Sequence, residues 1–258
     1  MTRQEFDVLT EKERRGAATP EELAALEPYR VRRAIFMAAG FGSRMAPLTE
    51  RIPKPLVPVF GKPLIETQLD AMLAAGIEEI YIVRGYLASA FDVLLEKYPM
   101  IRFLDNHIYN ETNSISSILL AAKYLPNAYV CEADMLLSNP ALITKYQYES
   151  NFLGVPVSHT DDWCYTVEDG IIRSVQMGGD DCYHQFVVSY WTKEDGERLA
   201  GHLKEAFQAP GGRNIFFEAV PLNIYTQEYN VHVRPCTFDD ILEIDTLEEL
   251  KALDPSYL

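Results

Sequence analysis

The sequence predicts an α/β protein: a Rossmann-like, doubly wound and mostly parallel sheet, preceded by a short helical arm and continued by an antiparallel region in the second half. Three observations support this fold class. Short apolar runs alternate with segments of helical spacing across residues 34–134, which is the pattern of βαβ units. Beyond Asp134 the runs follow one another as antiparallel strands do. Residues 1–33 differ from both parts in their many charges and alanines.

The charged segment at residues 1–33 contains the signature of a capped helix. Within residues 19–26, Thr19 is suited to the N-cap position, Pro20 to the first helical position and Glu22 to the third, where its side chain can close a capping box. We therefore expect a helical arm that packs on the main domain, in preference to the remnant of a separate regulatory or fused domain.

Residues 32–134 predict buried strands and helices in alternation. The first strand, residues 32–40, is a short apolar run that ends in small residues, as a parallel strand entering a loop does. The helix at 63–76 has Leu64, Leu69 and Met72 at helical spacing and stops at Gly76. The later elements follow the same pattern: strands at 78–85, 100–106 and 128–134, and helices at 88–98 and 114–125.

The second half predicts a lid of antiparallel strands over the first half. The strand-like runs are residues 152–159, 163–177 and 184–191, and Asp169-Gly170 is a hairpin-turn signal within the second run. An amphipathic helix at 192–207 and a strand running into a helix at 241–253 complete the pattern. We expect a single domain over residues 34–258, with the lid at about 151–235.

The composition excludes several classes of protein. Of 258 residues, 23 are Lys or Arg and 38 are Asp or Glu, which gives a formal net charge of −15 and argues against binding to nucleic acid or anionic membrane. No apolar run approaches the roughly 20 residues of a membrane span, and the first residues lack the apolar core of a signal peptide. The four cysteines are too scattered for a zinc site and too few for a disulfide framework. We expect a cytoplasmic protein with reduced thiols and no membrane insertion.

The strongest motif lies where the first strand meets its loop, the place at which an open α/β sheet binds ligands. Gly40 and Gly42 allow backbone N–H groups to approach phosphate oxygens, and Arg44 and Lys54 add the positive charge that an acidic protein needs there. The spacing is not that of a Walker loop, and it is not a dinucleotide fingerprint either, because only two glycines are present.

The string from Ala38 to Thr49, AAGFGSRMAPLT, together with the following Pro53-Lys54, resembles the signature of the sugar-phosphate nucleotidyltransferase superfamily. The resemblance covers roughly residues 33–253 and continues through Glu132-Ala133-Asp134 and Glu243-Ile244-Asp245. It implies that a phosphate or phosphonate oxygen attacks the α-phosphorus of a nucleoside triphosphate and that pyrophosphate leaves. It also implies Arg44 and Lys54 as catalytic residues and a Mg²⁺ ion on Asp134 and Asp245, since Mg²⁺ prefers oxygen ligands. Glu132 departs from the aspartate usual at its position, which leaves its role open.

Within the superfamily, the chain is most similar to bacterial CTP:phosphocholine cytidylyltransferases and to their relatives that act on 2-aminoethylphosphonate. The ordered pieces are Gly85-Tyr86-Leu87, the run from Thr112 to Ser117, Asp162-Trp163 and the stretch from Val188 to Trp191. This resemblance implies CTP as the donor. The residues expected to bind the nucleotide are Ala38, Ala39, Gly40, Phe41, Gly42, Ser43, Gly85, Tyr86, Asn113 and Ser116.

The second half contains both kinds of side chain that hold a cationic group. Aromatic faces, here Trp163, Tyr190 and Trp191, bind a quaternary ammonium, although only one of two adjacent strand residues can face a pocket. Carboxylates bind a primary ammonium, and the candidates are Asp161, Asp162 and Glu218. Because Glu218 follows Phe216 and Phe217, the balance tilts towards an amine-bearing acceptor such as 2-aminoethylphosphonate, with phosphocholine still open.

Two alternative functions remain. A sugar-1-phosphate uridylyl- or thymidylyltransferase would use the same chemistry on another acceptor. A catalytically silent, nucleotide-binding regulatory protein is less favoured, because such proteins usually lose charged residues of the kind that Arg44, Lys54, Asp134 and Asp245 provide. The oligomeric state is left open, with a homodimer as one option.

Overall fold

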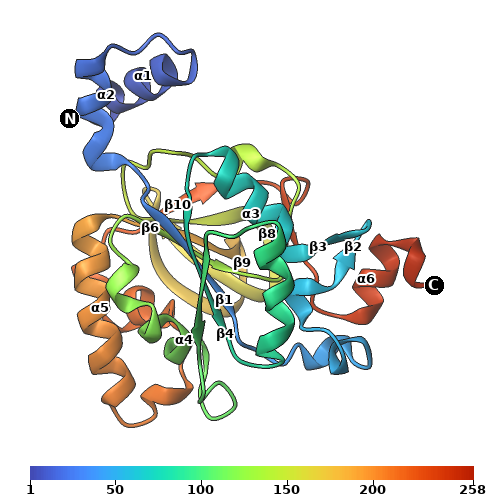
Figure 1. The fold of residues 1–258 in the computed structure, drawn as a ribbon. Coiled ribbons are helices and arrows are strands. Elements are labelled where there is room, and N and C mark those ends of the chain that lie inside the picture. Colours follow the sequence, from blue (N-terminus) through green and yellow to red (C-terminus); the bar gives the residue numbers. More distant parts are fainter.

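The computed structural model describes all residues from 1 to 258. A seven-stranded sheet in the order β10-β8-β9-β6-β1-β4-β5 runs through the molecule, with helices on both sides (Figure 1). Its parallel half consists of β1 (Arg33–Ala38), β4 (Glu79–Arg84), β5 (Ile101–Asp105) and β6 (Ala128–Glu132). This arrangement confirms the predicted doubly wound, mostly parallel sheet.

Strand β1 lies at the centre of the parallel half, because it pairs with β4 on one side and β6 on the other. Five of its six residues are buried, which explains its continuous apolar sequence. The helices α3 (Leu64–Ala74), α4 (Ser114–Leu120) and α5 (Lys193–Gln208) cover the sheet, with α4 and α5 side by side. Their apolar residues join the strands in one large core.

The antiparallel half is a long hairpin of β8 (Asn151–Glu168) and β9 (Ile171–Trp191). Asp169 and Gly170 both have positive φ, at 51° and 78°, as the two central residues of a type I′ turn require, so the predicted hairpin turn is confirmed. Strand β9 joins the parallel half by pairing antiparallel with β6, and β10 (His232–Pro235) pairs with β8.

Two small ribbons lie outside the main sheet. Strands β2 (Pro58–Val59) and β3 (Lys62–Pro63) form one of them. In the other, β7 (Met135–Leu137) pairs antiparallel with β11 (Ile241–Glu243), which precedes α6 (Leu247–Leu253). This second ribbon brings a late part of the chain next to the end of β6.

Two predicted helices differ from the structure. Residues Ala88–Glu96 form a 3₁₀ helix, and the Arg84 guanidinium donates to the Ala88 carbonyl at 3.1 Å in its first turn. The helix expected at 114–125 ends at Leu120, and residues 122–124 continue as a 3₁₀ turn.

The arm consists of α1 (Arg3–Arg14) and α2 (Pro20–Leu26), which extend from one end of the sheet (Figure 1). The capping box of Thr19 and Glu22 is present as predicted, and Thr2 with Glu5 forms a second one that the sequence analysis overlooked. Three buried residues, Phe6, Leu26 and Tyr146, anchor the arm to the body, and Lys145 donates to Glu13 at 2.6 Å. No helix of the structure is both long enough and apolar enough to cross a bilayer.

Phe6→Ala is expected to release the arm without changing turnover, because it removes the arm's anchoring ring at a cost of about 3 kcal/mol, while the arm contributes no residue to the site described below. Limited trypsin digestion should cut the basic α1 segment sooner than in the parent chain. Val8→Ala, on the same helix but 52% exposed, is the control. Equal digestion of both variants would show that Phe6 does not anchor the arm.

Candidate active site

The loop after β1 is shaped around Lys54. Gly42 has φ 61°, and a Cβ atom there would lie 2.8 Å from Cβ of Lys54, so only glycine permits this close approach. Thr49 fixes the loop by donating its hydroxyl to the Gly42 carbonyl at 2.9 Å. At Gly40, by contrast, a Cβ would meet nothing within 4 Å, so the backbone there faces open space. Gly42 is therefore needed for close packing against Lys54, whereas Gly40 leaves the backbone open.

Lys54 is the centre of an ion-pair network. Its Nζ donates to Asp134 Oδ2 at 2.7 Å and to Asp245 Oδ1 at 2.6 Å, with only 8% of the side chain exposed. Burial disfavours the charged amine, but the two carboxylates outweigh burial and raise the pKa of Lys54. Arg44 adds a second cation on Asp245 at 2.7 Å, with its own side chain 67% exposed. The two cations, Arg44 and Lys54, and the two carboxylates, Asp134 and Asp245, therefore form one network of ion pairs.

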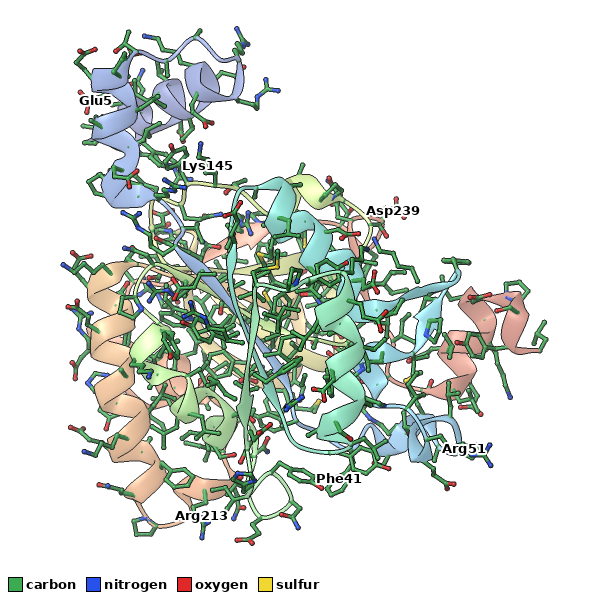
Figure 2. All side chains as sticks on the ribbon, in the orientation of Figure 1. Glu5, Phe41, Arg51, Lys145, Arg213 and Asp239 are labelled. Carbon is green, nitrogen blue, oxygen red and sulfur yellow. The ribbon has the colours of Figure 1, made fainter.

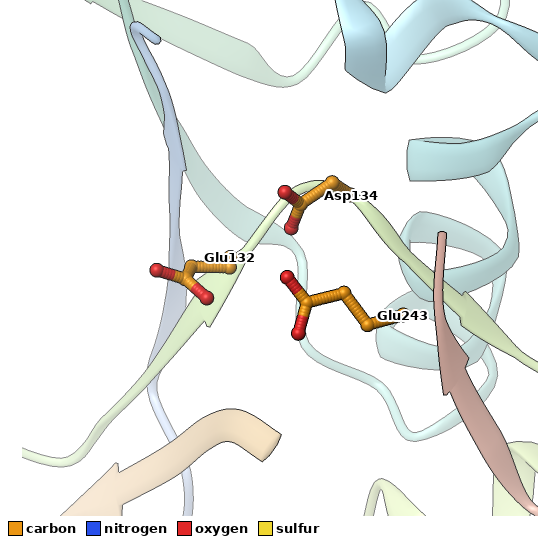
Figure 3. A group of neighbouring side chains, drawn as sticks. All are labelled: Glu132, Asp134 and Glu243. Carbon is orange, nitrogen blue, oxygen red and sulfur yellow. The ribbon is translucent and has the colours of Figure 1, made fainter. Parts of the chain in front are cut away.

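Three carboxylates gather at the ends of β6 and β11: Glu132, Asp134 and Glu243 each offer an oxygen, and these oxygens lie within 4.8 Å of one another (Figure 3). Burial and the neighbouring carboxylates raise the pKa of Glu132 well above its usual range and that of Glu243 to about 9. Asp134 Oδ1 is buried without a hydrogen-bond partner. An oxygen-rich, under-satisfied cluster of this kind fits a hard divalent cation such as Mg²⁺.

Two adjoining cavities continue from this centre. One, of about 300 Å³, is lined by the glycine loop and the ion-pair network, and includes Ala38, Phe41, Gly42, Ser43, Arg44, Lys54, Asp134 and Asp245. The other, of about 220 Å³, contains Ala39, Gly40, Asn113 and Ser116. Asp134 lines both. Twelve of the residues predicted for nucleotide, catalysis and metal therefore surround one continuous hollow.

Gly85 and Tyr86 stand beside these cavities. The Tyr86 N–H donates to the Ala39 carbonyl at 3.1 Å, which ties the end of β4 to the glycine loop. The Tyr86 ring lies 5.2 Å from that of Phe41, and Phe41 lies at the end of the molecule far from Glu5 of the arm and from Lys145, which contacts the arm (Figure 2). Gly85 lines a neighbouring cavity instead.

A third cavity of about 220 Å³ extends from the carboxylate cluster under the β8–β9 hairpin. Asp162, Trp163 and Glu218 line it, as predicted, and the Trp163 ring stands edge-on to that of Phe216 at 5.3 Å. Glu218 is 3% exposed, its Oε1 accepts from Gln185 at 3.3 Å and its Oε2 has no partner. Burial raises the pKa of Glu218 to about 7. The cavity has aromatic walls and an acidic, partly unpaired floor.

Three predicted acceptor residues do not reach this cavity. Trp191 is fully buried against Phe152 and Tyr229, and Tyr190 is buried with its hydroxyl donating to Asn127 at 3.2 Å. Both faces of β9 are covered at this point, so neither ring can contact a ligand. Asp161 points to solvent with 99% of its side chain exposed, beside His159. These positions correct the expectation for Tyr190, Trp191 and Asp161.

The structure adds residues that the sequence analysis did not single out. Glu243 joins the carboxylate cluster, and its signal was the alternation Glu-Ile-Asp, which places residues 243 and 245 on one face of a strand. Gln185 is the second residue of the strand predicted at 184–191 and had no local signal. Asn106 and Tyr109 lie in a loop whose sequence has no distinguishing motif.

Comparison with known proteins identifies the family of the chain. Residues 34–172 match the MobA-like NTP transferase domain, and the chain belongs to this family. It is therefore a nucleotidyltransferase. A 2-aminoethylphosphonate cytidylyltransferase from Lancefieldella rimae is 38% identical over 229 residues, which span 87% of this chain and 93% of the relative. A choline-phosphate cytidylyltransferase from Streptococcus pneumoniae is 31% identical over 86% of this chain and 96% of its own.

The fold agrees as well. A solved structure of the CTP:phosphocholine cytidylyltransferase from Streptococcus pneumoniae superposes with a TM-score of 0.81 at 30% identity, over 89% of this chain and 100% of the other.

Proposed function

We propose that the chain transfers CMP from CTP to a small phosphonate or phosphate that carries an amine, with 2-aminoethylphosphonate preferred to phosphocholine. The observation that carries the proposal is the acidic and aromatic cavity of Glu218 and Trp163, which opens onto the network of Lys54, Asp134 and Asp245. The acceptor's anionic end would face this network and its ammonium group would enter the cavity.

In the proposed reaction, an acceptor oxygen forms a bond to the α-phosphorus, and the bond to the β-phosphate oxygen breaks, releasing pyrophosphate. Lys54 and Arg44 would hold the triphosphate and neutralise the charge that grows on the α-phosphate. Asp134 and Asp245, next to Glu132 and Glu243, would hold Mg²⁺, which supplies further charge neutralisation.

The nucleoside would occupy the cavity that contains Ala39, Gly40, Asn113 and Ser116. Gly40 supports this placement because its backbone is open to the cavity. Close relatives that use CTP support the choice of nucleotide.

Trp163→Ala is expected to raise KM for phosphocholine about five- to thirtyfold, because it removes an aromatic face worth about 1–2 kcal/mol to a quaternary ammonium. Glu218→Gln should raise KM for 2-aminoethylphosphonate more than for phosphocholine, because only a primary ammonium donates hydrogen bonds to the carboxylate. The measurement is pyrophosphate release with each acceptor.

The pKa of Glu218 gives the same experiment a pH dependence. Its folded pKa of about 7 means that the carboxylate forms as pH rises through 7, so KM for the amine should fall over that range in the parent and not in Glu218→Gln. Asp181→Asn, at an exposed position of the β8–β9 hairpin that does not line the cavity, is the control. A neutral sugar 1-phosphate that proves the better substrate would overturn the amine pocket in favour of the sugar-activating function.

A further inference from the structure

We propose that Tyr109 sets the size of the nucleobase pocket and thereby selects a pyrimidine over a purine nucleotide. This inference rests on the proposed function, because it takes the nucleoside to occupy the cavity at Ala39 and Gly40. Tyr109 lies in the loop between β5 and α4.

Tyr109 separates two cavities. The nucleoside cavity of about 220 Å³ lies on one side of it, and a cavity of about 380 Å³ lined by Arg84, Gly85 and His107 lies on the other. The two cavities share only Asn106 and Tyr109 as lining residues. Asn106 is 2% exposed and lies at the base of the loop, so the projecting ring of Tyr109 is the wall between them.

The ring is held against Gly85 without free space. A Cβ atom built on Gly85 would lie 2.7 Å from Cγ of Tyr109 and 2.9 Å from its Cβ, distances that no side chain tolerates. Gly85 does not have a positive φ, so its small size serves the ring and not the backbone conformation. The resemblance to the nucleotidyltransferases implied that Gly85 contacts the nucleotide, and in the structure Gly85 is the residue against which the Tyr109 ring packs.

The loop that carries Tyr109 is rigid. Asn106 Oδ1 accepts from the Ile108 N–H at 3.1 Å, while its Nδ2 donates to the hydroxyls of Ser116 and Ser117 at 2.8 and 3.1 Å. The Asn106 N–H donates to the Arg84 carbonyl at 2.8 Å. On the outer side, the Phe41 ring packs 5.2 Å from Tyr109 and ties the wall to the glycine loop.

The far cavity offers no competing site for the triphosphate. Its one cation, Arg84, is paired with Asp105 at 2.7 Å and with Asp92 at 2.6 Å. Tyr109 lines the nucleoside cavity and does not line the cavity around Lys54, so with the phosphates held at Lys54 the base is the part of the nucleotide that would reach Tyr109. A purine carries a second ring beyond the pyrimidine and would have to occupy the volume of the Tyr109 side chain.

The test compares Tyr109→Ala with Tyr109→Phe in the full chain. In Tyr109→Ala the ratio of kcat/KM for ATP to that for CTP is expected to rise about tenfold or more, because the wall is gone. Tyr109→Phe keeps the ring and removes only a hydroxyl that makes no hydrogen bond within the chain, so the parent's preference should persist. Phe60→Ala removes a ring that is 64% exposed and lines neither cavity, and it controls for loss of an aromatic residue.

A second pair of variants tests the geometry without any substrate. Gly85→Ala should lower the melting temperature in the parent and have less effect in Tyr109→Gly, because the atoms that an added methyl group would approach within 3 Å, namely Cβ, Cγ and Cδ1, all belong to the Tyr109 side chain. An equal decrease in melting temperature in both backgrounds would show that the small size of Gly85 is not needed for packing of the Tyr109 side chain.

The outcomes separate this inference from the proposed function. If the parent uses CTP and Tyr109→Ala leaves the ATP-to-CTP ratio unchanged, or if the parent already accepts ATP as well as CTP, Tyr109 is not the size limit and the function stands. If the parent turns over no CTP, the proposed function fails. The ratio of the dissociation constants for ATP and CTP, measured by calorimetry in both variants, then decides the inference by itself.

Discussion

Asp134→Asn is expected to lower kcat by about a thousandfold while the chain stays folded. Asp134 lines all three cavities and stands at the end of β6, where Lys54 holds one of its oxygens and the other is buried without a partner. The asparagine keeps the shape and one oxygen for Lys54 but loses the charge that a divalent cation requires. Pyrophosphate release and a Mg²⁺ titration of turnover measure the effect.

The control for Asp134→Asn is Asp239→Asn, an exposed carboxylate, labelled in Figure 2, that lines none of the three cavities. Circular dichroism and melting temperature should match the parent in both variants. Asp245→Asn should behave like Asp134→Asn, because Asp245 is the other carboxylate on Lys54. Near-normal kcat in both active-site variants would remove these aspartates from the proposed metal site.

Lys54→Ala is expected to lower kcat by about a hundredfold or more and also to raise KM for CTP. A buried cation at the α-phosphate stabilises charge that is larger in the transition state than in the bound substrate, so its loss affects kcat. Steady-state kinetics with CTP at saturating acceptor measure both constants. An increase in KM alone would mean that Lys54 only contributes uniform binding.

Removing Lys54 also leaves Asp134 and Asp245 without their shared cation, and an unpaired buried carboxylate destabilises a fold by about 3–5 kcal/mol. Lys54→Met keeps the aliphatic stem that packs against Gly42 and separates lost packing from lost charge. Lys62→Met, a lysine that is 40% exposed and paired with Asp70, is the matched control. If Lys54→Met keeps parental kcat, the ammonium group has no part in the chemistry.

The sequence predicted the strands of the parallel half and the turn of the β8–β9 hairpin well because their signals are local. The run at β1 is apolar along its whole length, and Asp169-Gly170 has the backbone preference of its turn. The helix at residues 88–98 is a 3₁₀ helix over residues 88–96, and the spacing of apolar residues within so short a segment does not separate the two kinds of helix.

The residues of the candidate site also fall into two groups, those that a local sequence motif identifies and those whose position depends on the tertiary structure. Gly40, Arg44, Lys54 and Asp134 belong to a motif with a fixed order, and the structure brings them together. Trp191 and Tyr190 were selected by residue type alone, and covering of both faces of β9 by other parts of the chain decided their burial. Tyr109 escaped notice because its importance depends on Gly85, which only the tertiary structure places beneath it.

The ribbon of β7 and β11 makes the reaction centre a late product of folding. The ribbon pairs Leu137 with Ile241 across a long stretch of chain, and only this pairing delivers Glu243 and Asp245 to Asp134 and Lys54. Closing so long a loop is entropically costly and is slow compared with the local βαβ contacts. A refolding molecule can therefore possess its central sheet and still be inert. Recovery of turnover reports the pairing of β7 with β11, whereas recovery of secondary structure does not.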